Sequence, residues 1–280
     1  MADTTIVIPA RNEGPLLDAT LASLWTTPAG ASFEVIVVDD GSRPPVRAGQ
    51  AGGACRLLRT AGEGAAAARN RGAAVATADA LCFCDAHITF TPGWLRALLH
   101  GLEVRDAVCP GVGDAVRPKG AGYGFTWNAR CETRWLSPPP ELADVPFLPG
   151  ACLLVRRGAF AAVAGFDAGL VPWGYEDAEL SWALWLAGFR CAVQPTALIH
   201  HHFRRRHPYL VLQEEVDRNL LRVGCVHFGK ERLGRLATRL GASSEQLRQV
   251  DAAAASRRRW LGARRRKDDN WLCARFGLAL

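Results

Sequence analysis

Apolar and polar positions follow two different repeats in the first half of the chain. Short continuous apolar runs predict buried strands, and longer segments with apolar residues three to four positions apart predict helices. The expected strands and helices alternate, at 6–9, 16–25, 34–38, 64–77, 81–84 and 92–102. This alternation predicts an α/β fold with a mostly parallel sheet flanked by helices.

The second half has a less regular pattern. From residue 208 the pattern is helical to the end of the sequence, with a break near 241–244. The simplest architecture is one α/β domain over 1–207 and a helical extension over 208–280. The other expected features are a Gly- and Pro-rich loop, an apolar run, a helix and a strand, at 111–146, 147–155, 178–187 and 197–199.

Composition places the chain among soluble globular proteins. Its 280 residues are 49% hydrophobic and 22% charged, enough to bury a large core. No apolar run approaches the roughly 18 residues that a membrane span needs, and the N-terminus lacks the features of a signal peptide. The nine cysteines form no CxxC pair. They are typical of reduced, buried thiols, so we expect a cytoplasmic protein.

The net charge of +7 comes largely from three basic runs, at 204–206, 257–259 and 264–267. Such runs attract phosphates, acidic peptides or anionic membranes, although a solvated helix face is an equal alternative for the two C-terminal runs. Together with Trp260, Leu261 and Trp271 they suggest a peripheral contact with the inner membrane face. The chain lacks the aromatic-interleaved basic stretch that would indicate a nucleic-acid partner.

Residues that can bind a cation follow two of the predicted strands. Asp40 follows the strand at 34–38, and Asp85 and His87 follow the strand at 81–84. Alternate residues of an extended segment point to the same side, so Asp85 and His87 can face one divalent cation. Because ligands bind at the carboxyl ends of parallel strands, we expect Asp40 in the same crevice. A polar turn that caps the next helix is the alternative for residues 85–87.

An ordered set of motifs resembles the nucleotide-sugar-dependent glycosyltransferases with the GT-A fold. Segments 7–13, 37–42 and 68–72 resemble the donor-nucleotide signatures of family 2 glycosyltransferases. Residues 85–209 resemble more closely the catalytic domain of polypeptide N-acetylgalactosaminyltransferases. The motifs in that region are Asp85-Ala86-His87, Gly93-Trp94-Leu95, Phe125-Thr126-Trp127, Arg134-Trp135, Gly165-Phe166-Asp167, Trp173–Glu176, His201–Arg204 and Pro208-Tyr209.

The resemblance implies a GT-A fold and a metal-dependent transfer of a hexosyl or N-acetylhexosaminyl group from a UDP-sugar. Residues 1–110 would form the nucleotide-binding half of the domain, and residues 111–207 the acceptor-binding and catalytic half. The implied acceptor is a peptide or protein side chain, with a lipid-linked or polysaccharide acceptor as the main alternative. A nucleotide-sugar-binding protein without transferase activity is a third alternative.

The resemblance also implies three metal ligands, which are Asp85, His87 and His201. Oxygen and imidazole ligands together suit Mn²⁺, with Mg²⁺ or Co²⁺ as alternatives. His200 and His202 would then face the other way along the strand. A surface histidine within a histidine tract is the alternative for His201.

Donor contacts are expected from the two sequence halves together. Asp40 fits a hydrogen bond from the uracil N3–H, or a role in the turn alone. Arg69 and Arg71 are donors to base or phosphate, or exposed helix residues. Arg204 fits the diphosphate, and Trp173 a wall for the sugar face. The full expected set is Pro9, Ala10, Asp40, Arg69, Arg71, Asp85, Trp173 and Arg204.

Glu176 and Asp177 stand before a predicted helix, whose N-terminus favours carboxylates. They can serve only as caps. The polypeptide N-acetylgalactosaminyltransferases have Asn where this chain has Asp177, and a Glu-Asp pair resembles inverting enzymes. Asp177 would then be the general base that deprotonates the acceptor. If the Asp-x-His resemblance governs, the reaction retains configuration and Asp177 only orients a substrate. We expect inversion.

Overall fold

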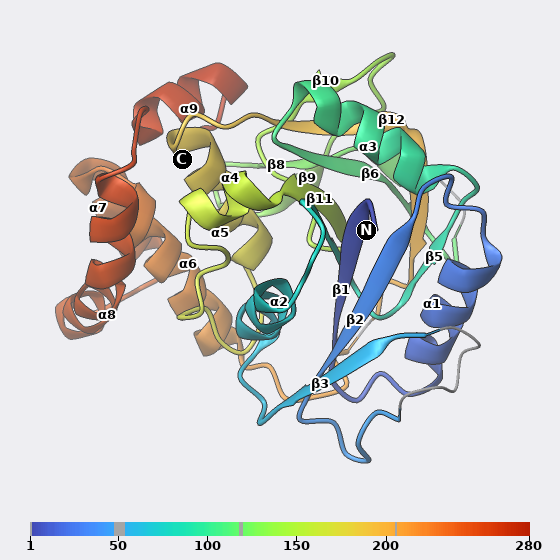
Figure 1. Ribbon diagram of the computed structural model, residues 1–280. Helices are drawn as coiled ribbons and strands as arrows, with labels where there is room; N and C mark the ends of the chain where they lie inside the picture. Colours follow the sequence, from blue (N-terminus) through green and yellow to red (C-terminus); the bar gives the residue numbers. More distant parts are fainter. Residues whose placement is uncertain (1, 48–53, 118–119, 205) are drawn as a thin grey trace.

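The computed structural model describes residues 2–47, 54–117, 120–204 and 206–280. Its main sheet has the strand order β10-β12-β6-β11-β4-β1-β2-β3, with β5 paired to β12 and β7 to β6 (Figure 1). The strands are β1 (Thr4–Ala10), β2 (Phe33–Asp40), β3 (Arg56–Thr60), β4 (Ala80–Cys84), β5 (Ile88–Phe90), β6 (Ala107–Asp114), β7 (Ala121–Gly122), β10 (Ala143–Asp144), β11 (Cys152–Arg156) and β12 (Cys191–His201), and a separate pair holds β8 (Phe125–Trp127) and β9 (Thr133–Trp135). The helices are α1 (Pro15–Thr26), α2 (Ala65–Ala74), α3 (Trp94–Val104), α4 (Arg157–Ala162), α5 (Glu176–Leu186), α6 (Gln213–His227), α7 (Lys230–Arg239), α8 (Ser244–Gly262) and α9 (Asp269–Phe276).

Parallel pairing is confined to two parts of the sheet. Strands β4, β1, β2 and β3 are parallel neighbours, and β6 is parallel to β12. Strand β11 lies antiparallel between β4 and β6 and joins the two parts. The expected α/β fold with a mostly parallel sheet flanked by helices is therefore confirmed, and β11 adds antiparallel pairing within the sheet.

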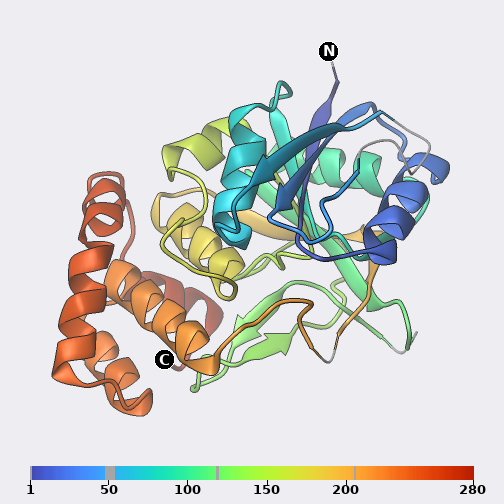
Figure 2. The ribbon, with the colours of Figure 1, turned by 90° about the horizontal axis from the view of Figure 1, so that it is seen from below.

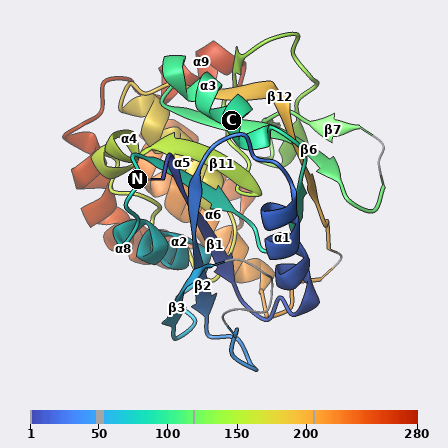
Figure 3. The ribbon, with the colours of Figure 1, turned by 45° about the vertical axis from the view of Figure 1, so that its right-hand side comes forward.

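The strands bury both faces, which explains their continuous apolar runs. Ile6 and Ile8 of β1 pack with α1 and α3, whereas Val7 packs with α2 on the other face. In Figure 3, α1 and α2 lie on opposite sides of β1 and β2. Burial of one such side chain contributes about 1.5–3 kcal/mol, so the alternation fixes which helix covers which face.

Several element boundaries differ from those expected. Helix α5 begins at Glu176, not near residue 178, so both acidic residues lie in its first turn. The strand expected at 197–199 runs over Cys191–His201. Strand β3 was missed because its residues are half exposed and alternate too weakly. The loop expected at 111–146 holds four short strands, and β6 also enters it.

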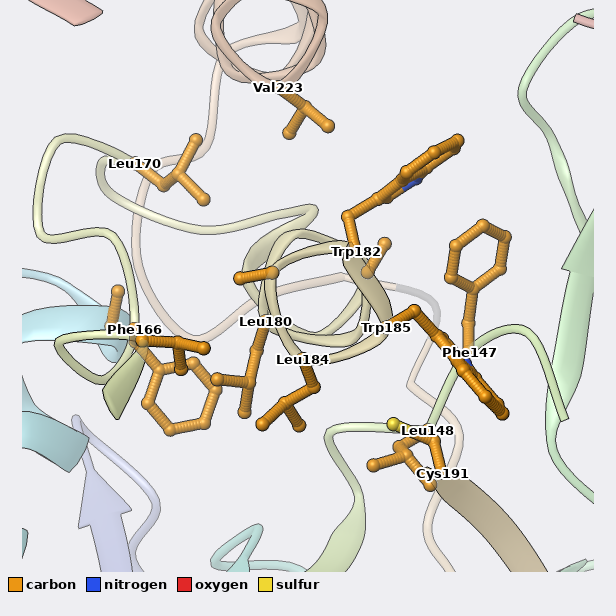
Figure 4. Packing of buried hydrophobic residues seen from close by; sticks show 14 of the residues in the cluster. Phe147, Leu148, Phe166, Leu170, Leu180, Trp182, Leu184, Trp185, Cys191 and Val223 are labelled. Atoms are coloured by element: carbon orange, nitrogen blue, oxygen red, sulfur yellow. The ribbon is translucent and has the colours of Figure 1, made fainter. Parts of the chain in front are cut away.

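Helix α5 is surrounded by apolar side chains. Leu180, Trp182, Leu184 and Trp185 project from it in different directions, and Val223 of α6 faces it (Figure 4). A helix that is apolar on all sides is typical of a buried position. Helix α5 therefore joins the sheet to the helices that follow it.

Helices α6–α9, orange to red in Figure 2, gather on one side of the molecule beyond α5. Their apolar side chains belong to the same core cluster as Val7 of β1 and Phe83 of β4. The helical region expected from residue 208 is present, and it shares its core with the rest of the chain. Among the described residues, none of the helices has the length and apolar character required to cross a membrane.

The C-terminal basic runs are partly used inside the protein. Arg257 is buried on Glu179. Arg265 donates to the backbone carbonyls of Val226 and His227. Leu261, which was expected beside the basic runs as part of a docking surface, is only 4% exposed. These residues do not support the membrane contact, which stays a prediction; Arg205 of the first run lies outside the described residues.

Candidate active site

A cavity of about 510 Å³ lies at the carboxyl ends of β1, β2 and β4. Its lining comes from both halves of the α/β region and from Pro208, Tyr209 and Val216 of the helical region. The predicted site residues that line it are Pro9, Ala10, Asp40, Arg69, Asp85, His87, Trp173, Glu176, Asp177, His201 and Arg204. One predicted residue, Arg71, does not line it.

Asp85, His87 and His201 converge in this cavity, with one ligand-capable atom of each within 4.8 Å of the others. Strand pairing explains the convergence, because β12 runs antiparallel to β5 and sets His201 opposite Ile88, next to His87. His201 Nε2 lies 3.4 Å from Asp85 Oδ2. Burial disfavours the charged form of Asp85, but the His201 hydrogen bond and the Arg69 guanidinium outweigh it and lower its pKa well below the ordinary value.

The donor set fits a divalent cation. A carboxylate and two imidazoles form a mixed oxygen and nitrogen site. Among the described residues, the buried Nδ1 of His201 has no hydrogen-bond partner. As strand alternation predicts, neither His200 nor His202 lines the cavity.

Glu13 also lines the cavity, beside the cluster, and it was not among the residues predicted from the sequence. Its carboxylate is 3.4 Å from His87 Nδ1 and is ion-paired with Arg204. Carboxylates in this position orient metal-binding histidines in other proteins. The signal that was available is the place of Glu13 just beyond the first predicted strand, as the last residue of segment 7–13. Arg204 thus lines the cavity while held by Glu13.

Arg69 is a buried link between the two halves of the site. Its guanidinium donates to Asp85 Oδ1 at 2.8 Å, to Glu176 Oε1 at 3.0 Å and to the Gly150 carbonyl at 3.3 Å. Arg71 lies two positions further along α2, which turns it to another face of the helix. Its side chain is 63% exposed and paired with Glu63, so the structure places it outside the cavity and lends no support to the expected donor contact.

Asp40 anchors the segment before α2. Its carboxylate accepts from the Thr60 hydroxyl at 2.5 Å and from the backbone N–H groups of Glu63 and Gly64 at 2.7 and 2.9 Å. The neighbouring Asp39, and not Asp40, accepts from Ser42 N–H to form the turn. The uracil contact of Asp40 stays a prediction.

Glu176 and Asp177 face the cavity from the first turn of α5. Glu176 Oε2 accepts from Gly174 N–H at 2.9 Å, and Asp177 Oδ2 accepts from Gly150 N–H at 2.9 Å. Burial, together with the nearby Glu176 carboxylate, raises the pKa of Asp177 to about 7. A carboxyl group with this pKa can exchange a proton near neutral pH, as a general base must.

Aromatic side chains surround the mouth of the cavity. Trp173 packs on His207, with ring centroids 4.4 Å apart, and Trp135 lies 6.2 Å from Phe203. Arg11 lies over the ring of Tyr209 at 4.9 Å. Phe203, His207 and Tyr209 stand in or beside the motif at 201–209, but their roles could not be assigned from the sequence.

A second group of metal-capable side chains, Cys82, Cys84 and Cys152, lies behind Asp85. All three are fully buried in the core on one face of the sheet. The three thiols have raised pKa values; burial contributes in each case and is the largest cause for Cys84. Since the thiolate is the metal ligand, these protonated thiols belong to the packing of the core.

A mixed sheet of this order, with a cluster that could hold a cation at the ends of its strands, is the GT-A fold of nucleotide-sugar glycosyltransferases. The family described as "Glycosyl transferase family 2" matches residues 5–163. The chain belongs to that family. It is also related to the catalytic domain of the polypeptide N-acetylgalactosaminyltransferases.

Three comparisons illustrate this relationship. Human polypeptide N-acetylgalactosaminyltransferase 10 is 31% identical over 258 residues, covering 81% of this chain and 42% of the relative. The pre-mycofactocin glycosyltransferase of Mycobacterium tuberculosis (strain ATCC 25618 / H37Rv) is 34% identical over 210 residues, covering 72% and 43%. The crystal structure of GalNAc-T7 with UDP, GalNAc and Mn²⁺ superposes with a TM-score of 0.82 at 20% identity, covering 99% of this chain and 57% of that one. The chain thus spans less than half the length of the curated relatives.

Proposed function

We propose that the protein is a metal-dependent glycosyltransferase that moves a sugar from a UDP-sugar to a hydroxyl group of a peptide or protein side chain. The observation that carries this proposal is the convergence of Asp85, His87 and His201 in the cavity that Asp177 also lines. The structure of GalNAc-T7 with UDP, GalNAc and Mn²⁺ supports the choice of donor and metal.

The donor would occupy the part of the cavity formed by the strand ends. Asp85, His87 and His201 would hold Mn²⁺ or Mg²⁺, which neutralises the charge of a departing diphosphate. Arg204 lies beside this cluster and can meet phosphate oxygens with its planar fork. The backbone of Pro9 and Ala10 would face the uridine.

Asp177 would act as the general base. The acceptor oxygen attacks the anomeric carbon, its proton passes to Asp177, and the bond from the anomeric carbon to the diphosphate oxygen breaks to release UDP. Attack opposite to the leaving group inverts the anomeric centre. The raised pKa of Asp177 supports this role. If the sugar keeps its configuration, Asp177 would instead orient the acceptor.

The names of the relatives support a peptide acceptor, because polypeptide N-acetylgalactosaminyltransferases of several animals match the chain. A specific observation favours a glycan as the second candidate. Trp135, Phe203 and Trp173 are 42%, 45% and 39% exposed around the cavity mouth. Exposed aromatic faces of this kind pack well against the apolar face of a sugar ring.

The test is a UDP-release assay with Mn²⁺, a set of UDP-sugars, and either peptides or oligosaccharides as acceptors. We expect release that depends on one acceptor class and is lost in Asp177→Asn. Arg71→Ala is the matched control, because Arg71 lies outside the cavity, and it should keep activity. Binding of UDP-sugars without any turnover would contradict the proposed transferase activity and favour a nucleotide-sugar-binding protein.

A further inference from the structure

Among the described residues, Arg257 of α8 makes the most hydrogen bonds of any arginine that the catalytic proposal does not use. It is buried, and its Nε and Nη2 atoms donate to the Glu179 carboxylate at 3.1 and 2.9 Å. Its guanidinium also donates to the carbonyls of Val163 at 2.6 Å and Gly165 at 2.9 Å. One side chain of the C-terminal region is therefore fixed to two separate segments of the α/β region.

The first segment is the opening turn of α5. Glu179 N–H donates to the Tyr175 carbonyl at 2.8 Å, which closes this turn. Glu176, one turn before Glu179, accepts the hydrogen bond from Arg69, and Asp177 lies beside it. A shift of Glu179 would therefore move both acidic residues that line the cavity.

The second segment is the turn that ends at Gly165 and Phe166. The amide side chain of Asn70 donates to the Phe166 carbonyl at 2.8 Å and accepts from Phe166 N–H at 3.0 Å. The Phe166 ring lies 5.5 Å from the Arg69 guanidinium. A side chain at Gly165 would meet Asn70 Oδ1 at 2.6 Å, so this contact with α2 requires glycine.

Arg257 therefore contacts the segments next to both members of the buried Arg69–Glu176 ion pair. Glu179 lies one turn after Glu176, and Gly165 precedes Phe166, whose ring lies near Arg69. We propose that Arg257 is a positioning residue, which sets α5 against α2 so that this ion pair forms and holds Asp85 and Asp177 at the cavity. A buried ion pair adds little net stability compared with apolar packing. The Arg69–Glu176 pair instead fixes the position of α5 relative to α2. This assigns a role to part of the basic run at 257–259.

Glu179, the carboxylate partner of Arg257, is also contacted by His227 of α6. His227 Nε2 lies 2.9 Å from Glu179 Oε1, and both side chains are fully buried. The His227 ring is also stacked near Trp182 of α5, with centroids 6.0 Å apart. Glu179 therefore receives contacts from α6 and α8 together, which leaves it little freedom to move.

The test compares Arg257→Met with Arg259→Met, whose side chain is exposed in the same run. Amide hydrogen exchange is measured first, because it does not depend on the proposed function. In Arg257→Met we expect the amides of Glu179 and Phe166 to exchange at least about tenfold faster. The amides of β1 and β4, and all amides of Arg259→Met, should stay unchanged. Exchange that rises equally in β1 and β4, or that does not rise at all, would overturn the proposal.

Turnover is the second readout, and it rests on the proposed function. We expect kcat to fall by about tenfold to a hundredfold, as displaced catalytic groups do, and the Kd of UDP measured with Mn²⁺ to rise as well, because Arg69 also holds Asp85. Arg257→Lys keeps the positive charge but lacks the planar guanidinium group, and it should recover part of kcat. Normal turnover in Arg257→Met would contradict the positioning role. An inactive wild type would contradict the proposed function, and the exchange result alone would then test the positioning role. If Arg257→Met does not fold, Glu179→Gln provides the same exchange comparison.

Discussion

Single side chains at this site have more than one partner, and their second partners determine where they point. Asp85 is held by Arg69 on one oxygen and faces His201 with the other. His87 Nδ1 lies 3.4 Å from the Glu13 carboxylate. Contacts of this kind orient side chains toward a bound cation.

The histidine tract offers a direct comparison between neighbours. We expect His201→Ala to weaken Mn²⁺ binding in the presence of UDP by at least the ~10–100-fold that loss of an outer-shell partner costs. His202→Ala is the control, because its contact with His87 uses only the backbone N–H. Calorimetric titration of Mn²⁺ measures both variants. Equal loss in the two would contradict the assignment of His201.

The raised pKa of Asp177 predicts two opposite pH effects. The deprotonated base is the active form, so turnover should rise as the pH passes through about 7. The folded state binds this proton more tightly than the unfolded chain, whose pKa is near 3.8. The stability contributed by Asp177 is therefore full below about pH 4 and lost as the pH rises through 7.

Thermal unfolding tests the second effect. Between about pH 5 and pH 8, the Tm of the wild type should fall relative to that of Asp177→Asn, which does not titrate. The other titrating groups are common to both proteins and cancel in the comparison. Parallel Tm curves for the two proteins over this range would show that Asp177 titrates at its ordinary pKa.

At the scale of helices and strands, apolar runs were a good guide where burial was complete. The runs at 6–9, 34–38 and 81–84 correspond to β1, β2 and β4. Strand β3 was missed since its exposure depends on its position at the sheet edge, which a local pattern does not contain. In the site, the position after a strand indicated Asp85 and His87, whereas Glu13, which also follows a predicted strand, was not singled out.

Helix phase explains why one predicted arginine faces the cavity and the other does not. Arg69 and Arg71 are equally basic, and the motif at 68–72 does not distinguish them. Only the packing of α2 on β1, through Gly72, turns Arg69 toward the cavity. A short alanine-rich helix has no strong apolar stripe, so its orientation could not be predicted from the sequence pattern.

The close approach of α2 to β1 makes Gly72 a testable position. A methyl group there would lie 2.3 Å from Val7 Cγ1, so Gly72→Ala should destabilise the fold by about 1–3 kcal/mol. Gly234 in α7 has open space around it, and Gly234→Ala should stabilise by about 0.5–1 kcal/mol. Urea unfolding measures both variants, and a Gly72→Ala variant as stable as the wild type would contradict the close packing.

At the scale of the whole molecule, the site depends on contacts between distant parts of the sequence. His201 follows Asp85 by 116 residues, and Arg257 follows Glu179 by 78. Local patterns could not predict these pairings; the resemblance selected His201, and nothing in the sequence indicated Arg257. The helical region that was expected as an extension contributes to the same core as the sheet. We therefore expect it to be required for a correctly formed cavity.

The central claim is that the cavity binds a uridine diphosphate through a divalent cation held by Asp85, His87 and His201. Its most direct test is the calorimetric titration of UDP into the purified protein, once with Mn²⁺ and once with EDTA. The account predicts saturable binding with Mn²⁺ that is lost with EDTA. UDP binding of equal strength in both titrations, or in neither, would contradict it.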